Sequence, residues 1–223
     1  MKKQLAVLAV LLVAVQFSSA QQTSASEFQY GVQAGVNLAN FTEGQDFINR
    51  VGLNAGLFAT YKSTESALGL RSGIHYSQLG VKTSGRTSSI FSEDSRAFEA
   101  IAKLDYLQVP VLLDYNLSPA FSLFAGSQVS FLVNNSESYD YKAASGMQAS
   151  SFEQELENVQ TVSLSGVVGA RAFLYKNAFI QAQYELGFYD IFEDNEFPQD
   201  GNRTFSYKDF RYSVFTFVLG YQF

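Results

Sequence analysis

The chain has 223 residues, no cysteine and one histidine, and its 15 basic against 21 acidic side chains give a formal net charge of −6. A chain without cysteine has no disulfides and no lipid anchor on an N-terminal cysteine. The acidic excess makes the chain a poor candidate for binding nucleic acid, because proteins bind nucleic acid mainly through Lys and Arg on its phosphates, and we expect no nucleic-acid partner.

The first twenty residues have the pattern of a secretory signal. Lys2 and Lys3 come first, an apolar run covers residues 5–15, and small residues lead up to Ala20. These are the basic, apolar and cleavage-site parts of a signal peptide. The apolar run is too short to cross a bilayer as a helix, which needs about 20 residues. We therefore expect export and cleavage after Ala20.

From Phe28 onward, apolar and polar residues alternate in eight successive runs. In the last run, Phe215, Phe217 and Leu219 share one face of an extended chain, and Thr216 lies on the other. A period of two residues is typical of a β-strand with one apolar face. The predicted strands cover residues 28–37, 51–62, 67–79, 104–117, 121–132, 162–175, 178–189 and 211–223.

Three residues disturb the alternation. Pro110 lies inside the fourth predicted strand, and because proline cannot donate to a β-ladder we expect an edge or a bulge there. Val214 and Val218 lie on the otherwise polar face of the last strand. For these two valines the sequence offers no role beyond packing.

The connections between the strands are alternately long and short: 38–50, 63–66, 80–103, 118–120, 133–161, 176–177 and 190–210. This alternation places all tight turns at one end of the structure and all long loops at the other. Bacterial outer-membrane barrels have short periplasmic turns and longer extracellular loops. An even number of strands also returns the chain end to the periplasmic side.

The apolar face is expected to point outward. A soluble barrel of the lipocalin type would turn it inward. The Gly, Ser, Gln and Asn of the polar face suit a narrow filled lumen, and each run is long enough for a tilted membrane strand, which needs about 9–11 residues. Aromatic residues also form two plausible interfacial girdles. These are Tyr30, Tyr61, Tyr115, Phe121, Tyr221 and Phe223 near the turns, and Tyr76, Phe131 and Phe188 near the loops.

The sequence therefore predicts an all-β fold, an eight-stranded antiparallel up-and-down transmembrane β-barrel in a bacterial outer membrane. The signal peptide covers 1–20, a short periplasmic segment covers 21–27, and the barrel covers 28–223.

Three segments, FQYGVQAGVNLANF, DYLQVPVLLDYNL and FVLGYQF, resemble the PorT-type outer-membrane β-barrel family of Bacteroidetes, often called the porin family. The resemblance covers essentially the whole mature chain. It implies fold and location, since most members have no assigned activity and a minority serve in protein secretion. Phe223 resembles the terminal aromatic that barrel-assembly machinery recognises.

Five charged residues fall on the polar face, and we expect them to form a charge network in the lumen: Lys62, Arg71, Asp114, Arg171 and Glu185. An unpaired buried charge is expensive, so opposite charges should pair and fill the barrel. The interior of eight strands is just wide enough for side chains. A gated ion path, a ligand site or a narrow small-solute channel is the alternative.

Catalysis has one weak candidate. His75 and Ser77 share a strand face, so a histidine base could activate a serine nucleophile, and the H-x-S spacing looks like that of lipid A deacylase barrels. Our register points His75 inward, however, away from lipid, and no acidic residue is placed to orient it. We expect no enzyme activity.

No metal site or cofactor is predicted. The loop carboxylates lack the spacing of a calcium loop, and solvated loops near lipopolysaccharide explain them better. They are Glu93, Asp94, Glu153, Glu155, Glu157, Glu193, Asp194, Glu196 and Asp200. Phe152, Leu156 and Val159 fit either a short amphipathic helix or a disordered loop.

The predicted function is a structural or interaction scaffold that acts through its extracellular loops, because binding surfaces usually lie on loops held by a rigid frame. Its predicted partners are outer-membrane lipid, lipopolysaccharide, the assembly machinery and an unknown protein or ligand at the loops.

Overall fold

The computed structural model describes residues 26–41, 47–63, 66–88, 95–141, 150–155, 159–189 and 211–223. The predicted signal peptide lies outside these residues. No helix long and apolar enough to cross a bilayer occurs in the described part of the chain. The described strands are β1 (Ser26–Phe41), β2 (Phe47–Ser63), β3 (Leu68–Ser88), β4 (Ser95–Ser118), β5 (Phe121–Tyr141), β6 (Ser150–Gln154), β7 (Val162–Tyr175), β8 (Ala178–Gly187) and β9 (Tyr212–Gln222).

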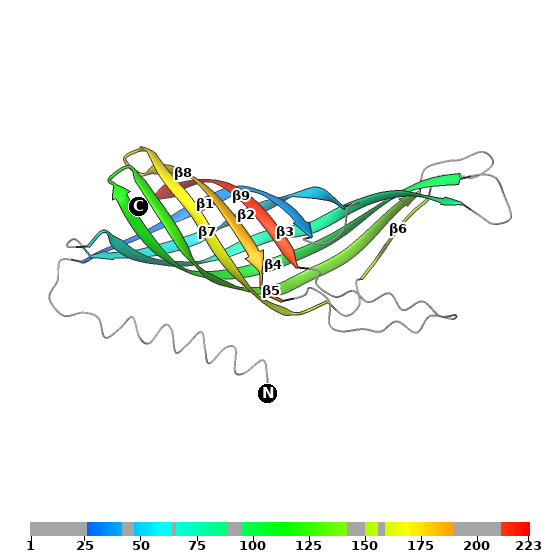
Figure 1. Ribbon diagram of the computed structural model, residues 1–223, viewed down its shortest axis with the longest axis horizontal. Helices are drawn as coiled ribbons and strands as arrows, with labels where there is room; N and C mark the ends of the chain where they lie inside the picture. Colours follow the sequence, from blue (N-terminus) through cyan, green and yellow to red (C-terminus); the bar gives the residue numbers. More distant parts are fainter. Residues whose placement is uncertain are drawn as a thin grey trace, which may run out of the picture.

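Eight of these strands close into a barrel (Figure 1). All described pairings are antiparallel, β1 pairs with β9, and the β4–β5 pairing completes the ring. β6 lies outside the ring and pairs with the C-terminal part of β5, residues 137–141. The predicted eight-stranded antiparallel barrel is confirmed. Closure leaves no unpaired backbone edge in the wall, as the interior of a bilayer requires.

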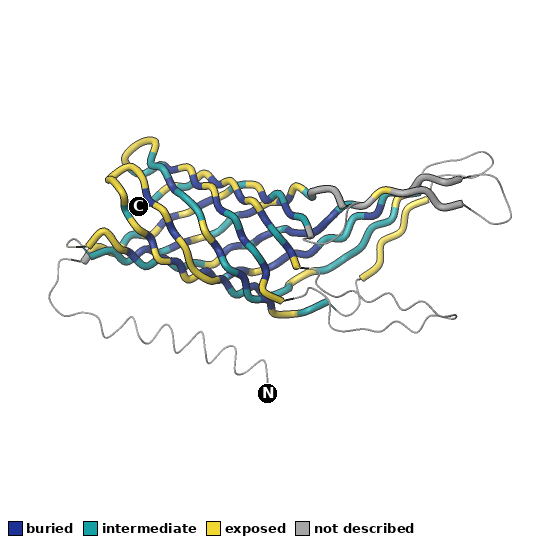
Figure 2. Tube along the Cα trace, viewed as in Figure 1, coloured by how far each residue is buried: buried dark blue, intermediate teal, exposed yellow. Residues whose placement is uncertain are grey.

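The strands alternate between exposed and buried residues, visible as bands in Figure 2. On β9, Phe215, Phe217 and Leu219 are each more than half exposed, whereas Val214 and Thr216 are at most 1% exposed. Large apolar side chains therefore cover the outer wall, and polar side chains turn inward. This arrangement suits a barrel surrounded by lipid.

Three strands continue well past their predicted ends. β3 extends to Ser88 and pairs with the start of β4 at Ser95, and β5 extends to Tyr141. β6 then pairs with this added part of β5. We call residues 80–88, 95–104 and 133–141 together with β6 the projecting sheet. Its base, which includes Val81 and Leu104, still belongs to the barrel, and the remainder extends beyond the rest of the rim (Figure 1). Where they are described, the predicted loops 80–103 and 133–161 are thus largely strand.

Phe152 lies in β6, directly opposite Tyr139 of β5. The predicted amphipathic helix is wrong at this position, and so is the disordered loop. Backbone pairing with β5 outweighed the helical spacing, which depended on only three apolar residues.

Pro110 is accommodated without a bulge. The β4–β5 register runs unbroken through Pro110↔Gln128. On the other side, the β3–β4 ladder pairs Ser72 with Val111, skips two residues and resumes in the same register at His75. The skipped pairs lie where proline has no N–H to donate. The predicted edge or bulge at Pro110 is therefore wrong.

Candidate functional site

The end of the lumen near the tight turns holds an ion cluster from three strands. Asp114 of β4 lies between two arginines, with Oδ1 3.3 Å from Arg71 Nη2 of β3 and Oδ2 3.2 Å from Arg171 Nη2 of β7. All three side chains are at most 4% exposed. A carboxylate shared by two guanidinium groups offsets much of the cost of burying the charges.

Gln181 of β8 completes this cluster. Its Oε1 accepts hydrogen bonds from Arg71 Nη1 at 2.8 Å and from Arg171 Nε at 3.3 Å. Aromatic faces support the arginines: Arg71 lies 4.7 Å from the ring centre of Phe124, and Arg171 lies 5.2 Å from that of Phe179. Cation–π contacts of this kind strengthen when they are removed from water.

Three inward phenylalanines pack over glycines at this end. Each phenylalanine lies directly opposite a glycine of the adjacent strand: Phe58 and Gly31, Phe124 and Gly169, Phe179 and Gly220. A Cβ added to these glycines would come within 2.5, 2.4 and 2.1 Å of the facing ring. The missing side chains therefore make room for the rings inside a narrow barrel.

Glu185 lies apart from the ion cluster, in the middle of the lumen. Its carboxylate accepts hydrogen bonds from Ser165 Oγ at 2.7 Å, Gln128 Nε2 at 2.8 Å and Gln108 Nε2 at 3.4 Å. It takes part in none of the described ion pairs, and neither does the half-buried Lys62. The structure thus brings together three of the five residues of the predicted charge network.

Near the loops, a cluster of buried apolar side chains lines the lumen. Val214, which had no assigned role in the sequence, is fully buried in this layer. The cluster consists of Ala39, Leu79, Val81, Leu104, Tyr106, Tyr212 and Val214, with Ala102, Leu132 and Val159 packed against it. A smaller apolar cluster of Leu112, Phe124 and Val167 lies nearer the turns.

Sequence reasoning missed these interior apolar residues. Phe58, Phe124, Val167 and Phe179 occupy positions of the polar face and break its composition. The sequence did contain a signal for them: a large apolar residue at an inward position needs a small residue on a neighbouring strand to make room for it. Glycine supplies that room for the three phenylalanines.

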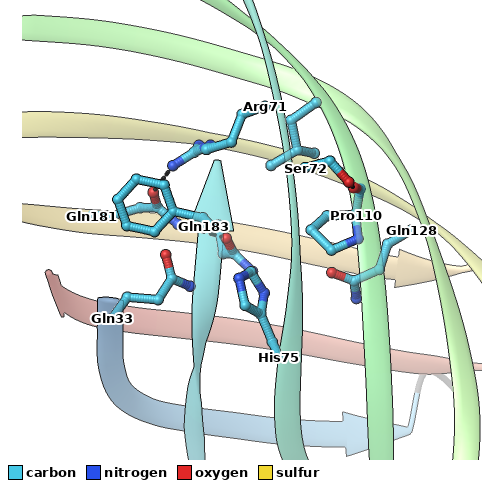
Figure 3. A pocket seen from close by; sticks show the side chains of 10 residues that line it. Gln33, Arg71, Ser72, His75, Pro110, Gln128, Gln181 and Gln183 are labelled. Carbon is cyan, nitrogen blue, oxygen red and sulfur yellow. Dashed lines mark hydrogen bonds between the residues drawn. The ribbon is translucent and has the colours of Figure 1, made fainter. Parts of the chain in front are cut away.

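His75 and Ser77 both face the lumen. Ser77 Oγ accepts a hydrogen bond from Asn37 Nδ2 at 2.9 Å, and Asn37 Oδ1 accepts one from Thr216 Oγ1 at 2.9 Å. His75 Nε2 has no hydrogen-bond partner among the described residues. It borders a void of about 10 Å³ between Gln33 and other lumen side chains (Figure 3). The void has room for about one water molecule, and nothing in this arrangement lets either residue reach lipid.

The predicted girdle residues all point away from the lumen. Those exposed by more than a third are Tyr30, Tyr115, Phe121, Phe188 and Tyr221, and those partly exposed are Tyr61, Tyr76 and Phe131. Phe223 packs against Tyr30, with ring centres 5.6 Å apart, and its N–H donates to the Tyr30 carbonyl at 2.8 Å. The end of the chain is thereby fixed to β1.

The projecting sheet carries ion pairs on its surface. Lys82 lies 2.6 Å from Glu99, and Lys103 lies 3.3 Å from Glu153. Glu153 also accepts a hydrogen bond from Ser136 Oγ at 2.7 Å. The Ser136 hydroxyl and the Lys103 ammonium lower the pKa of Glu153.

Carboxylates do not gather into a metal site in the described residues: none of these residues belongs to a group of three or more His, Cys, Asp or Glu. The loop acids Glu93, Asp94, Glu157, Glu193, Asp194, Glu196 and Asp200 lie outside the described part of the chain.

Comparison with known proteins gives a family match over most of the chain. Residues 19–193 match the family described as outer membrane protein beta-barrel domain. A search of curated proteins gives no match.

Several solved barrels are similar at low identity. Ail of Yersinia pestis, in complex with the heparin analogue sucrose octasulfate, is 13% identical, with 88% of this chain and 99% of that chain covered and a TM-score of 0.44. Neisserial surface protein A is 14% identical, with 89% and 99% covered and a TM-score of 0.41. The CymD monoaromatic hydrocarbon channel is 10% identical, with 91% and 88% covered and a TM-score of 0.36.

Proposed function

The chain belongs to the outer membrane protein beta-barrel domain family, and we propose that it is a barrel with a closed lumen that serves as an interaction scaffold. Its place is the outer membrane. Side-chain packing in the lumen keeps the barrel wall rigid. The projecting sheet and the loops beside it form the binding surface. Lipid and lipopolysaccharide surround the wall, and a protein or ligand binds above it.

The observation that carries this proposal is the filling of the lumen. Successive layers cross it from the turns to the loops: the ion cluster with its aromatic rings, the hydrogen bonds to Glu185, and the apolar cluster around Val214. The void beside His75 measures about 10 Å³, whereas a groove of about 610 Å³ lies on the outer wall across β1, β7, β8 and β9. A void of this size has room for about one water molecule, which supports a lumen closed to larger solutes.

The position of the projecting sheet supports the scaffold role. On its β5 and β6 strands, polar and charged side chains occupy both faces of this sheet, which suits contact with water. It is a direct continuation of β3, β4 and β5, and the parts of these strands nearer the tight turns belong to the closed barrel. A binding surface held in this way needs little ordering when a partner arrives.

Planar bilayer recordings test the closed lumen. We expect the folded chain to give no conductance above that of the lipid alone, while a general-diffusion porin reconstituted in parallel gives open-channel currents. Steady conductance that scales with the amount of inserted protein would overturn the proposal. Resistance to heat unfolding on a detergent gel, measured on the same sample, shows that the silent protein is folded.

A further inference from the structure

We propose that the groove on the outer wall across β1, β7, β8 and β9 binds one acyl chain of a glycerophospholipid from the periplasmic leaflet, and that Lys176 holds the phosphate of the same lipid molecule. The groove lies on the wall that faces lipid, apart from the loops and the projecting sheet. It is therefore a site beyond the proposed scaffold function, and either can be wrong without the other.

The floor of the groove consists of alanines on two neighbouring strands. Ala170 of β7 lies directly opposite Ala182 of β8, and Ala172 follows on the same face of β7. An alanine side chain ends at Cβ, so the wall is low at these positions. Arg171 and Gln181 also border the groove. Because their side chains are hydrogen-bonded to each other inside the lumen, only their backbone can contribute to the outer surface.

Large apolar side chains rise on both sides of this floor. Phe217 of β9 lies opposite Ala182, and Phe121 of β5 lies opposite Ala172. Phe217 is 51% and Phe121 is 38% exposed, and both line the groove together with Leu219. The groove measures about 610 Å³, within the range of small-molecule pockets, about 300–1,000 Å³. Its apolar floor and rims are complementary to a hydrocarbon chain.

The groove lies in the part of the wall nearer the tight turns. Phe121 is the first residue of β5 after the turn at 118–120, and Ala172 precedes Lys176 by four residues, or about 13 Å along the strand. Half of a typical hydrocarbon core is about 15 Å thick. Because the tight turns of bacterial outer-membrane barrels are periplasmic, the groove faces the periplasmic leaflet. That leaflet consists of glycerophospholipids, whereas lipopolysaccharide occupies the outer one.

Donors for a lipid phosphate lie at the turn between β7 and β8, on the periplasmic side of the groove. Lys176 in this turn is exposed and takes part in none of the described ion pairs. Tyr175 beside it is 74% exposed. A lysine ammonium and a tyrosine hydroxyl both donate hydrogen bonds, and tyrosine is enriched where a membrane meets water. A lipid whose chain fills the groove therefore has its phosphate at the level of this turn.

A second copy of the chain fits the groove less well than an acyl chain does. In a symmetric dimer the same patch of both copies meets itself, so two hollows would face each other. The rims formed by Phe217 and Phe121 would touch first and leave a void between the floors. A flexible acyl chain can follow the hollow and fill it.

Native mass spectrometry of the folded full-length barrel in detergent tests the site. The probe is palmitoyl-oleoyl phosphatidylglycerol, titrated against the unaltered chain and its variants. Lipid A is titrated separately. We expect one phosphatidylglycerol molecule to bind saturably and more tightly than lipid A. Resistance to heat unfolding on a detergent gel shows that each variant is folded.

Variants locate the acyl chain. Ala182→Phe fills the floor of the groove and should weaken the affinity tenfold or more, because the displaced methylenes lose their contact with the wall. Ala125→Phe, the same change at an exposed position of the outer wall that does not line the groove, should leave the affinity unchanged.

A second pair of variants locates the phosphate. Lys176→Glu should weaken the affinity about fivefold, the contribution of one lysine at an anionic lipid surface. Lys62→Glu, the same charge reversal near the tight turns but on β2, should leave it unchanged.

Each contrary result overturns the proposal. Equal effects of Ala182→Phe and Ala125→Phe would exclude the groove, and equal effects of Lys176→Glu and Lys62→Glu would exclude a phosphate site at Lys176. Tighter binding of lipid A would overturn the periplasmic leaflet. Concentration-dependent dimers that Ala182→Phe abolishes would assign the groove to a second copy. Channel conductance with normal lipid binding would remove the closed lumen and leave the lipid site standing.

Discussion

The two ends of the lumen are lined by side chains of opposite character. Near the turns, two buried arginines share one carboxylate and rest on phenylalanine rings. Near the loops, the filling is apolar, and Val214 and Leu104 are almost completely buried. The outer wall is apolar at both ends, as the exposed side chains of β9 illustrate.

This difference teaches that lipid constrains only the outward residues of each strand. The inward residues need only fill space and satisfy one another, so one lumen can combine ions, amides and hydrocarbon. The two fillings should also fail differently. Removing one side chain of the ion cluster leaves an unpaired buried charge near the turns. Removing one side chain of the apolar cluster leaves a cavity near the loops.

The largest expected effect is at the ion cluster. Asp114→Leu leaves Arg71 and Arg171 buried without a carboxylate and should lower the free energy of unfolding by about 3–5 kcal/mol. Urea unfolding in detergent micelles, followed by far-UV circular dichroism, measures this change. Asp140→Leu, which removes an exposed acid of the projecting sheet, is the control and should have no measurable effect. Equal losses in both variants would show that the buried pairing does not matter.

The apolar end should respond to lost volume. Leu104→Ala opens a cavity in the cluster around Val214 and should cost about 2–5 kcal/mol of unfolding free energy. Leu107→Ala, three residues along β4 on the outer face, should cost less, because lipid fills the space that the side chain leaves. The same urea titration compares them. A larger loss at Leu107 would reverse our assignment of the two faces.

The pairing of phenylalanine with glycine is tested by adding one methyl group. Gly220→Ala places a Cβ about 2.1 Å from the Phe179 ring and should destabilise the barrel by about 1–3 kcal/mol through overpacking. Gly69→Ala is the matched control, since its nearest neighbour would lie 3.2 Å away. If both alanines are tolerated equally, the rings do not depend on the glycines.

The smallest effect is expected at Ser77. Ser77→Ala removes one acceptor of Asn37, which keeps further contacts with the carbonyls of Leu53 and Gln78, so the loss should be about 1 kcal/mol. Lipid A from cells that produce this variant should be identical to that from cells with the unaltered chain, as mass spectrometry can show. A change in acylation would revive the enzyme alternative for His75 and Ser77.

The membrane part of the fold could be predicted from the sequence because lipid imposes a period of two on the outward residues. Water imposes no such period, and this is why the continuation of β3 to Ser88 and of β5 to Tyr141 was not predictable. β6 was missed for the same reason, since the residues on both of its faces are exposed.

The lumen contacts could be predicted only in part. The alternation predicted Arg71, Asp114 and Glu185 to point inward, and all three are buried, but a period cannot say which side chains meet across the barrel. Arg71 and Gln181 are hydrogen-bonded although 110 positions separate them. That contact depends on the closed ring and its register, which a single strand pattern does not contain.

The three phenylalanine–glycine pairs have a consequence for how the wall assembles. A slip of one residue between β8 and β9 would move Phe179 to the opposite face of the wall relative to its partner strand and leave the hole at Gly220 unfilled. The same holds for Phe58 on β2 and Phe124 on β5. Each phenylalanine–glycine pair therefore favours the native register of its two strands over a slipped register. The three pairs lie on three separate strand pairs around the ring.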